Sequence, residues 1–297
     1  MREEDGRRVD WANSVKLLRP VTIADAVAAL SGEAEARCLA GGQTLVAMMN
    51  ADLLRPSALV SLRHIEAMHG VSAQQDGAIR IGAMATHAEI AAFAGFRGGQ
   101  RIIGAAARRI AHAPIRNAGT IGGSIAHGDP AADFPTALIA ADAEISVAGP
   151  QGMRRIAAAN FFLDFLQTAL EASEVVVAIH IPPAPADARS HYEKLTRIDG
   201  DFAIVSAGVV LAEGADGRCS HARLVAGACG PTPIRSAAAE AWLVGSRLGA
   251  EDREAAAELL AAACNPIDDF RGSAAYRRKV LPRLITRAIE AAWGAVQ

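Results

Sequence analysis

The chain has 297 residues, 51% hydrophobic and 21% charged, a composition that indicates a globular protein and excludes a disordered one. Its formal net charge of −2 argues against binding to nucleic acid through phosphate contacts. The four cysteines are too far apart for a zinc or in-chain iron–sulfur motif, so we expect no metal site. The charged N-terminus and the lack of an 18-residue apolar run predict a cytoplasmic protein without a transmembrane segment.

Helix and strand patterns alternate along the first half of the chain. A helix is predicted over 22–30, where Thr22 and Asp25 resemble a capping box. Three strands and two helices follow. The strands are predicted before Gly41 and over 59–65 and 78–86. The first helix is predicted over 87–94, after a capping box of Thr86 and Glu89, and the second over 101–111, where Pro114 is expected to stop it.

The second half continues the alternation around a proline-rich linker. A helix-to-strand passage and an alternating strand over 174–182 lead to this linker, "PPAPADAR" (182–189), where we place the main boundary. Two more strands and three helices follow. The last helix, 276–293, has an apolar stripe opposite a charged face that we expect to be solvated, unless it meets an acidic partner. The residues of that face are Arg277, Arg278, Lys279, Arg283 and Arg287.

Two glycine-rich stretches carry the chemistry. "AGGQT" (40–44) and "GTIGGS" (119–124) each combine a Gly-Gly pair with a nearby hydroxyl. Consecutive glycines let backbone N–H groups crowd around an anion, and a hydroxyl adds one more donor. Neither stretch is a Walker A motif or a Rossmann fingerprint. Either alone could be a tight turn, but two together predict a grip on a diphosphate from both sides.

Two aspartates follow the second stretch. Asp129, before Pro130, is predicted to be the N-cap of a helix with the proline at its first position. Asp133 would then lie in the first turn, where it could serve the helix dipole or accept hydrogen bonds from sugar or ribityl hydroxyls. His127 is expected in the loop, and His87 at a helix start.

Four segments in order carry a family resemblance: "AGGQTL", "RNAGTIGGSIAHGDPAADFPTAL", "EVVVAIHIP" and "YEKLTRIDGDFAIV". Together they resemble the FAD-binding medium subunit of molybdenum hydroxylases, the xanthine dehydrogenase and carbon monoxide dehydrogenase group. The resemblance implies an α+β fold like that of vanillyl-alcohol oxidase. Two FAD-binding subdomains, 1–63 and 64–183, would be followed by a C-terminal α+β domain, 184–297.

The resemblance also implies a set of cofactor-binding residues and no catalytic residue. Lys194 falls where a lysine reaches toward the flavin, with a surface lysine as the alternative. Ile110 falls near an adenine-packing position but is aliphatic here, and Thr44 stands where many relatives have serine. The implied cofactor-binding residues are Leu39, Ala40, Gly41, Gly42, Gln43, Thr44, Leu45, Val46, Asn117, Gly119, Thr120, Ile121, Gly122, Gly123, Ser124, Asp133, Val176 and Lys194.

On this resemblance the chain is an oxidoreductase subunit that transfers electrons through FAD. A partner small subunit with two 2Fe-2S clusters would supply the electrons, and a large subunit would hold the molybdenum cofactor. The three are expected as a dimer of heterotrimers, with NAD, dioxygen or a quinone as acceptor. The alternatives are a stand-alone FAD-dependent oxidoreductase and a non-redox nucleotide-binding scaffold.

Overall fold

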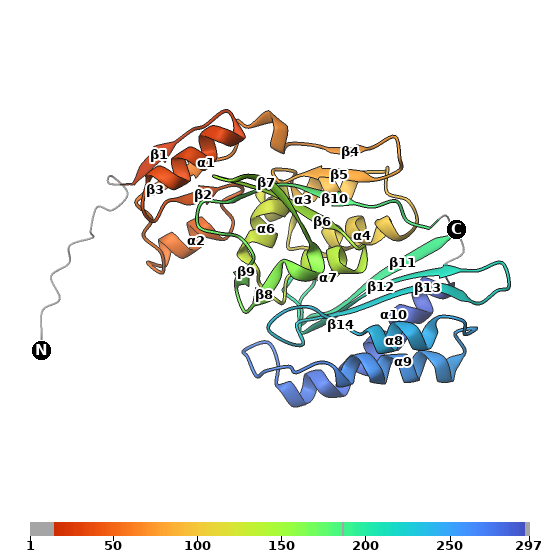
Figure 1. Cartoon of the computed structure of the whole chain (residues 1–297). Coiled ribbons are helices and arrows are strands. Elements are labelled where there is room, and N and C mark those ends of the chain that lie inside the picture. The colour runs from red at the N-terminus through yellow and green to blue at the C-terminus, as the bar shows by residue number, and fades with distance from the viewer. Residues whose placement is uncertain (1–14, 186, 295–297) are drawn as a thin grey trace, which may run out of the picture.

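The N-terminal lobe is a small parallel sheet with two helices. The computed structural model describes residues 15–185 and 187–294 (Figure 1). The sheet has the order β1-β3-β2. Helix α1 begins where the sequence predicts, because the Thr22 hydroxyl accepts from the Asp25 N–H at 3.1 Å. The elements are β1 (Lys16–Leu18), α1 (Ile23–Gly32), β2 (Arg37–Leu39), α2 (Leu45–Asn50) and β3 (Ala58–Ser61).

A five-stranded antiparallel sheet forms the centre of the molecule, in the order β4-β5-β10-β6-β7. The strands are β4 (Val71–Ala73), β5 (Ile79–Gly82), β6 (Glu144–Gly149), β7 (Gly152–Ala157) and β10 (Val175–Ile181). Between β5 and β6 the chain forms α3 (His87–Ala92), α4 (Arg101–Arg109), α5 (Ala113–Ala118), α6 (Ile121–His127) and α7 (Asp133–Ala140). Between β7 and β10 lies a small hairpin, β8 (Phe162–Asp164) and β9 (Gln167–Thr168).

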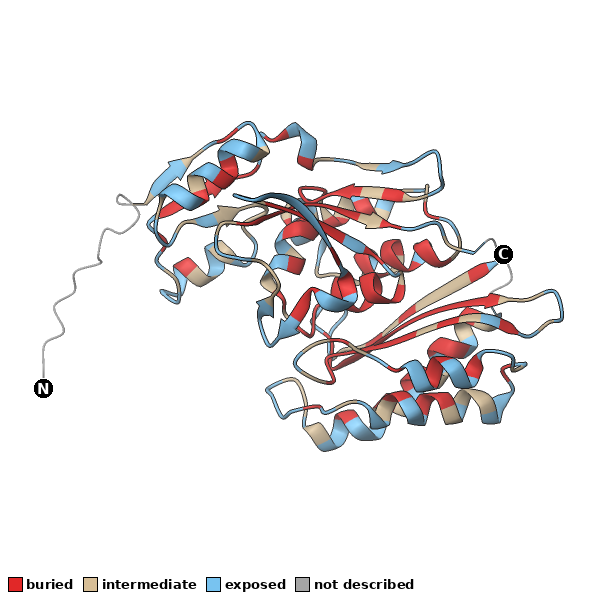
Figure 2. Cartoon of the chain, in the orientation of Figure 1, coloured by how far each residue is buried: buried red, intermediate tan, exposed pale blue. Residues whose placement is uncertain are grey.

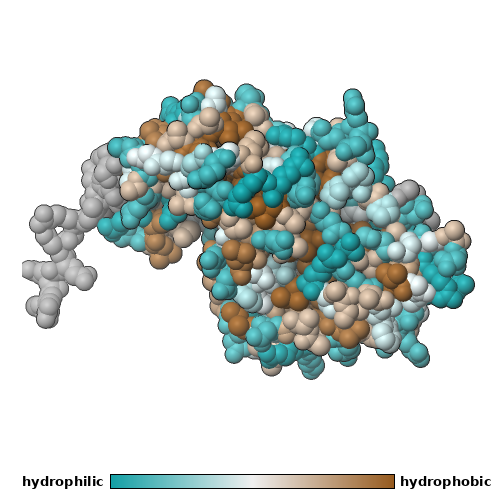
Figure 3. Space-filling view, in the orientation of Figure 1, coloured by the Kyte–Doolittle hydropathy of each residue, from teal (hydrophilic) through white to brown (hydrophobic). Residues whose placement is uncertain are grey.

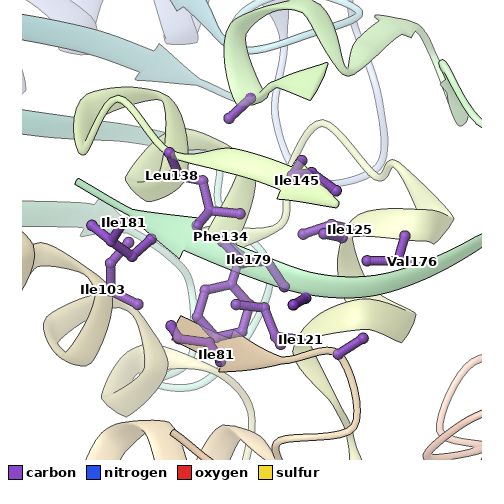
Figure 4. Close-up of a cluster of buried hydrophobic side chains, with 14 of the residues drawn as sticks. Ile81, Ile103, Ile121, Ile125, Phe134, Leu138, Ile145, Val176, Ile179 and Ile181 are labelled. Atoms are coloured by element: carbon purple, nitrogen blue, oxygen red, sulfur yellow. The ribbon is translucent and has the colours of Figure 1, made fainter. Parts of the chain in front are cut away.

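The main core lies where α6 and α7 meet the central sheet. Figure 4 shows Ile121, Ile125 and Phe134 of these helices together with Ile81 and Ile179 of the sheet, and all five side chains are fully buried or nearly so. Burying apolar area of this kind stabilises by about 25 cal/mol per Å².

The C-terminal part is a third sheet, order β11-β12-β13-β14, with helices against its far face (Figure 1). Strand β12 packs on α7 on one face and on α10 on the other, so it is buried on both faces (Figure 2). The elements are β11 (Ala188–Leu195), β12 (Val205–Glu213), β13 (Cys219–Gly227), β14 (Ile234–Arg235), α8 (Ala237–Leu243), α9 (Ala250–Ala262) and α10 (Ala274–Gly294). Among the described residues, none of the helices is long and apolar enough to cross a bilayer.

Helix α7 lies between two sheets, and each of its residues is buried. On the side of the third sheet it packs against glycines. A Cβ on Gly227 would lie 2.2 Å from the Thr136 hydroxyl, and one on Gly208 would lie 3.2 Å from the Ala140 methyl. The two glycines therefore let the helix approach the sheet closely.

The sequence predicts the wrong end for one helix and for two strands. The helix predicted over 101–111 ends at Arg109, and Pro114 does not stop it but lies in the first turn of α5. Proline is tolerated there because the first N–H groups of a helix have no intrahelical acceptor. The strand predicted over 59–65 ends at Ser61, and the one over 78–86 ends at Gly82.

The charged face of α10 contains one buried residue. Arg277 is only 2% exposed, against the expectation of a solvated side chain. Its guanidinium donates to the carbonyls of Ile204 (2.9 Å) and Ile267 (2.6 Å) and to the carboxylate of Asp269 (2.6 Å). It therefore joins the helix to the start of β12 and to the loop before α10. The other four basic residues of the face are exposed, as predicted.

Candidate functional site

A cavity of about 770 Å³ lies between the N-terminal lobe and the central sheet. Its walls come from the loop between β2 and α2, the start of α6, the hairpin end at 166–168 and the residues leading into β10. The C-terminal part adds the loop 200–202. Figure 3 shows the surface indented below the N-terminal lobe, between the parts that Figure 1 labels α2 and β8–β9. The volume is within the range of about 300–1,000 Å³ usual for small-molecule sites.

The first glycine stretch forms a turn with unused donors. It follows β2, and Gly42 has φ +73°, a conformation that favours glycine. Within residues 15–185 and 187–294, the backbone N–H groups of Gly41, Gly42, Gln43 and Thr44 find no acceptor. All four residues line the cavity. Consecutive free N–H groups in such a turn form an anion-binding concavity.

The structure brings the two glycine stretches together. A Cβ on Gly41 would lie 2.1 Å from the Ala118 carbonyl oxygen and 2.9 Å from the Gly119 Cα, so no larger residue fits there without a shift of the backbone. The two stretches therefore form one continuous part of the wall, although they are far apart in the sequence.

The second stretch is the beginning of α6 and not a loop. Thr120 is its N-cap, with the hydroxyl accepting from the Gly123 N–H at 3.2 Å. The N–H groups of Ile121 and Gly122 donate to the carbonyls of Ala85 (3.1 Å) and Ala83 (2.8 Å). The expectation that this stretch offers free backbone donors is therefore wrong.

Glycine 122 is needed by the fold itself. A Cβ there would lie 2.7 Å from the Ala83 carbonyl oxygen. Gly123 is different, because its Cβ would meet only the Thr120 hydroxyl at 3.1 Å and the Ala40 methyl at 3.7 Å. Of the two glycines, Gly123 is thus the one that leaves space between the two stretches.

Asp133 and Lys194 form a buried ion pair beside the cavity. The Lys194 ammonium lies 2.9 and 3.1 Å from the two carboxylate oxygens, and the side chains are 0% and 6% exposed. The Tyr192 hydroxyl donates to the same carboxylate at 2.8 Å. Lys194 also donates to the carbonyls of Arg109 (2.8 Å) and Asp201 (2.9 Å), which fixes two segments of the cavity wall. Lys194 is therefore neither a surface lysine nor part of the lining.

Burial dominates the ionisation of this cluster. It raises the pKa of the Asp133 carboxyl, and the nearby Lys194 ammonium opposes that rise. Burial, together with the Asp133 charge, also raises the pKa of Tyr192 well above its ordinary value. Tyr192 therefore stays a neutral hydroxyl that donates to Asp133.

Two polar residues next to the second glycine stretch differ from the prediction. Asp129 does not cap a helix; its carboxylate accepts from the Ala131 N–H at 2.8 Å, and α7 begins only at Asp133. His127 is the last residue of α6, not a loop residue.

The predicted cofactor-binding residues that line the cavity are Ala40, Gly41, Gly42, Gln43, Thr44, Leu45, Gly119, Thr120, Gly122, Gly123, Ser124, Asp133 and Val176, with Ile110 beside them. Those that do not line it are Leu39, Val46, Asn117, Ile121 and Lys194.

Several lining residues have no signal in the sequence. They include His87 at the start of α3, the hairpin residues 166–168 and the loop 200–202. The Phe202 side chain is 43% exposed and lies against the guanidinium of Arg271 at 5.0 Å. Burial, assisted by the charge of Arg116, lowers the pKa of His87 to about 4, so its imidazole is neutral near pH 7.

Both parts of the chain match known families. Residues 13–184 match the FAD binding domain in molybdopterin dehydrogenase, and residues 190–292 match the CO dehydrogenase flavoprotein C-terminal domain. The chain is 34% identical over 275 residues to the carbon monoxide dehydrogenase medium chain of Hydrogenophaga pseudoflava, covering 92% of this chain and 95% of that one. It is 35% identical over 276 residues to the nicotine 6-hydroxylase medium subunit of Paenarthrobacter nicotinovorans, covering 93% and 96%.

A solved structure shares the whole fold. A chain of reconstituted CO dehydrogenase from Oligotropha carboxidovorans aligns with a TM-score of 0.91 at 36% identity, covering 95% of this chain and 99% of that one. This likeness confirms the α+β FAD-binding fold that the sequence predicts.

Proposed function

The chain belongs to the FAD-binding medium subunits of the molybdenum hydroxylases, and on that premise we propose that it is the electron-transfer subunit of such a complex. This family is the one that the four segments of the sequence resemble. Its relatives are dehydrogenase and hydroxylase subunits, so the chain is an oxidoreductase subunit that binds FAD. In the proposal it takes electrons from an iron–sulfur small subunit and passes them to NAD, dioxygen or a quinone.

The assignment of the cavity depends on the four N–H groups of the first stretch, which have no acceptor among the residues that the structure describes. We propose that residues 41–44 hold the diphosphate, because they offer consecutive donors in a wall that also contains the Thr44 hydroxyl. Gly123 leaves room opposite them. Bound FAD supplies the chemistry, since a flavin accepts electrons singly and delivers them in pairs. The protein is left with binding and orientation.

Val176 and Asp133 complete the proposed contacts from the sequence. Val176, near the start of β10, presents a buried apolar wall. Asp133 lines the cavity, but Lys194 and Tyr192 already use both of its oxygens. We therefore propose that Lys194, which does not line the cavity, acts on the cofactor site by holding Asp201 of the wall and Arg109, the residue before the lining residue Ile110.

The proposed partners are a small iron–sulfur subunit and a large molybdenum-binding subunit, as a dimer of heterotrimers. The support is that the relatives are named medium chains or medium subunits. A related structure is named as a Cu,Mo-CO dehydrogenase. We also propose the division into 1–63, 64–183 and 184–297, because each range contains one of the three larger sheets.

Titration of the purified chain with FAD tests the cavity assignment. Gly123→Val should abolish binding, because its side-chain methyls would enter the space between the two glycine stretches. Gly32→Val is the matched control, since Gly32 also lies in a helix and its Cβ would meet nothing within 4 Å. FAD binding by Gly123→Val at wild-type affinity would refute the assignment. A wild-type chain that takes up no FAD would favour the non-redox scaffold.

Purification from the native host tests the subunit proposal. We expect co-purifying subunits, found by mass spectrometry, together with iron and molybdenum. A free monomer with full turnover and neither metal would instead support a stand-alone oxidoreductase.

A further inference from the structure

His87 is a buried side chain in the cavity wall that the proposed function does not use. It is the first residue of α3, which Thr86 and Glu89 hold in a capping box. Its backbone N–H donates to the Gly119 carbonyl at 3.0 Å, which ties it to the second glycine stretch. The residue is 6% exposed, and the ring centroid lies 5.4 Å from that of Phe134. Its imidazole is therefore held between α3, α5 and α7.

The two ring nitrogens have different surroundings. Nδ1 is sealed from solvent and has no hydrogen-bond partner among the described residues. Nε2 lies against the open side of Gly119, where a Cβ would come within 2.7 Å of it. The glycine thus leaves the space that the Nε2 edge of the ring occupies.

These surroundings decide where the proton is. A neutral imidazole carries one N–H, and a buried N–H without an acceptor costs about 1–3 kcal/mol. A proton on Nδ1 would be such a donor. We therefore assign the proton to Nε2, which lies beside Gly119, and both His87 and Gly119 line the cavity.

We propose that His87 is a cofactor-binding residue. Its neutral imidazole donates the Nε2–H to a hydrogen-bond acceptor of the FAD in this cavity. The inference rests on the proposed placement of FAD between the two glycine stretches. The acceptor is an oxygen of the diphosphate or a carbonyl oxygen or ring nitrogen of the flavin, and each of these atoms accepts a hydrogen bond from an N–H group.

Two substitutions at His87 test this donor in the full-length chain. Glutamine keeps an N–H donor at a similar reach, so His87→Gln should bind FAD within about twofold of wild type. Leucine removes the donor, so His87→Leu should bind about tenfold more weakly. His64→Leu is the control, because His64 is exposed and does not line the cavity.

The thermal stability of the apoprotein separates binding from folding. A leucine replaces a sealed nitrogen without a partner by apolar atoms, so apo His87→Leu should unfold at or above the wild-type midpoint. A purely structural role predicts the opposite: a lower midpoint and unchanged FAD affinity. His87→Leu with wild-type affinity, or His87→Gln as weak as His87→Leu, would overturn the proposal.

Gly119 offers an independent route to the same ring. Gly119→Ala should displace Nε2 and weaken FAD binding several-fold, because the new methyl would lie 2.7 Å from it. In the His87→Leu background the same change should cost less, and the double-mutant cycle measures that coupling. Additive effects would show that Gly119 acts without His87 and would contradict the inference.

Titration with ADP identifies the half of the cofactor that accepts the bond. A loss of affinity by His87→Leu for both ADP and FAD assigns the acceptor to the diphosphate. A loss for FAD alone, with a shifted flavin spectrum or midpoint potential, assigns it to the flavin. A wild-type chain that binds neither ligand would refute the proposed function itself, which is a different result from a variant that binds like wild type.

Discussion

Replacing Lys194 by methionine should destabilise the protein strongly. The ammonium lies within 3.1 Å of both Asp133 oxygens and donates to two carbonyls besides, at 2.8 and 2.9 Å. Methionine fills much of the same space but leaves a buried carboxylate with only the Tyr192 hydroxyl. Removing one partner of a buried ion pair costs about 3–5 kcal/mol. In calorimetry of the apoprotein, this loss should lower the unfolding midpoint by roughly 5–8 °C, because the unfolding entropy is about 2.1 cal/mol/K per residue for a chain of 297 residues.

The same substitution on the surface provides the control. Lys16 pairs with Glu33 at 2.6 Å, but the lysine side chain is 61% exposed. Lys16→Met should therefore cost at most about 1 kcal/mol. Equal midpoints for Lys194→Met and Lys16→Met would refute the argument that burial makes the inner pair important.

The pH dependence of the Lys194→Met defect gives a second readout. Burial raises the pKa of Asp133 in the folded protein, and losing the ammonium removes the main opposing effect. Above the ordinary carboxyl pKa, Asp133 is deprotonated in the unfolded chain but still protonated in the folded variant. The stability of the variant therefore falls as the pH rises from the ordinary pKa to the raised one. The defect should be largest near neutral pH and should shrink as the pH is lowered toward 4.

Three further outcomes follow from buried contacts. Arg277→Met should lower the free energy of unfolding by about 2–4 kcal/mol, because two carbonyls and a carboxylate lose their donor; an unfolding midpoint equal to wild type would contradict this. Gly122→Ala should cost about 1–3 kcal/mol even without FAD, since its Cβ would lie 2.7 Å from a carbonyl oxygen, and an apoprotein of unchanged stability would exclude that clash. The low pKa of His87, about 4, means that the unfolded state binds the extra proton between pH 6.5 and 4, so stability should fall by about 3 kcal/mol as the pH drops through this window. His87→Leu should remove that part of the slope in denaturant titrations, and an unchanged slope would show that another group causes it.

Local patterns predict one helix cap and one buried helix face correctly. The Thr86–Glu89 capping box is present, with Thr86 N–H to Glu89 at 2.7 Å and Glu89 N–H to the Thr86 hydroxyl at 3.2 Å. The apolar stripe of the last helix is buried from Leu281 to Ala292. Caps and stripes depend on residues three or four positions apart, so the sequence contains the whole interaction.

The errors concern interactions between distant segments. Arg277 lies on the polar side of a helical wheel, yet its three acceptors come from elsewhere in the chain. The donors of Ile121 and Gly122 are used by the segment before α3, which no spacing in the glycine motif shows. A glycine pair indicates close approach of the backbone, but not whether a ligand or the protein itself approaches.

The sequence likewise predicts only part of the cavity wall. The composition of the two glycine stretches marks them as candidates, whereas the hairpin at 166–168 and the loop at 200–202 carry no motif. The family resemblance points to Lys194, but its position inside the protein depends on how β11 packs beside α4.

The position of α7 has a consequence for synthesis on the ribosome. The helix ends at Ala140, but the strand that covers its second side ends at Gly227, so about 90 residues must still be made before the helix is covered. At roughly 5–20 residues per second this takes about 4–17 s. During that time an apolar surface of the nascent chain is open to chaperones or to other chains. The loop at 200–202 is made in the same interval, so the wall of the cavity is complete only after residue 202 has been translated.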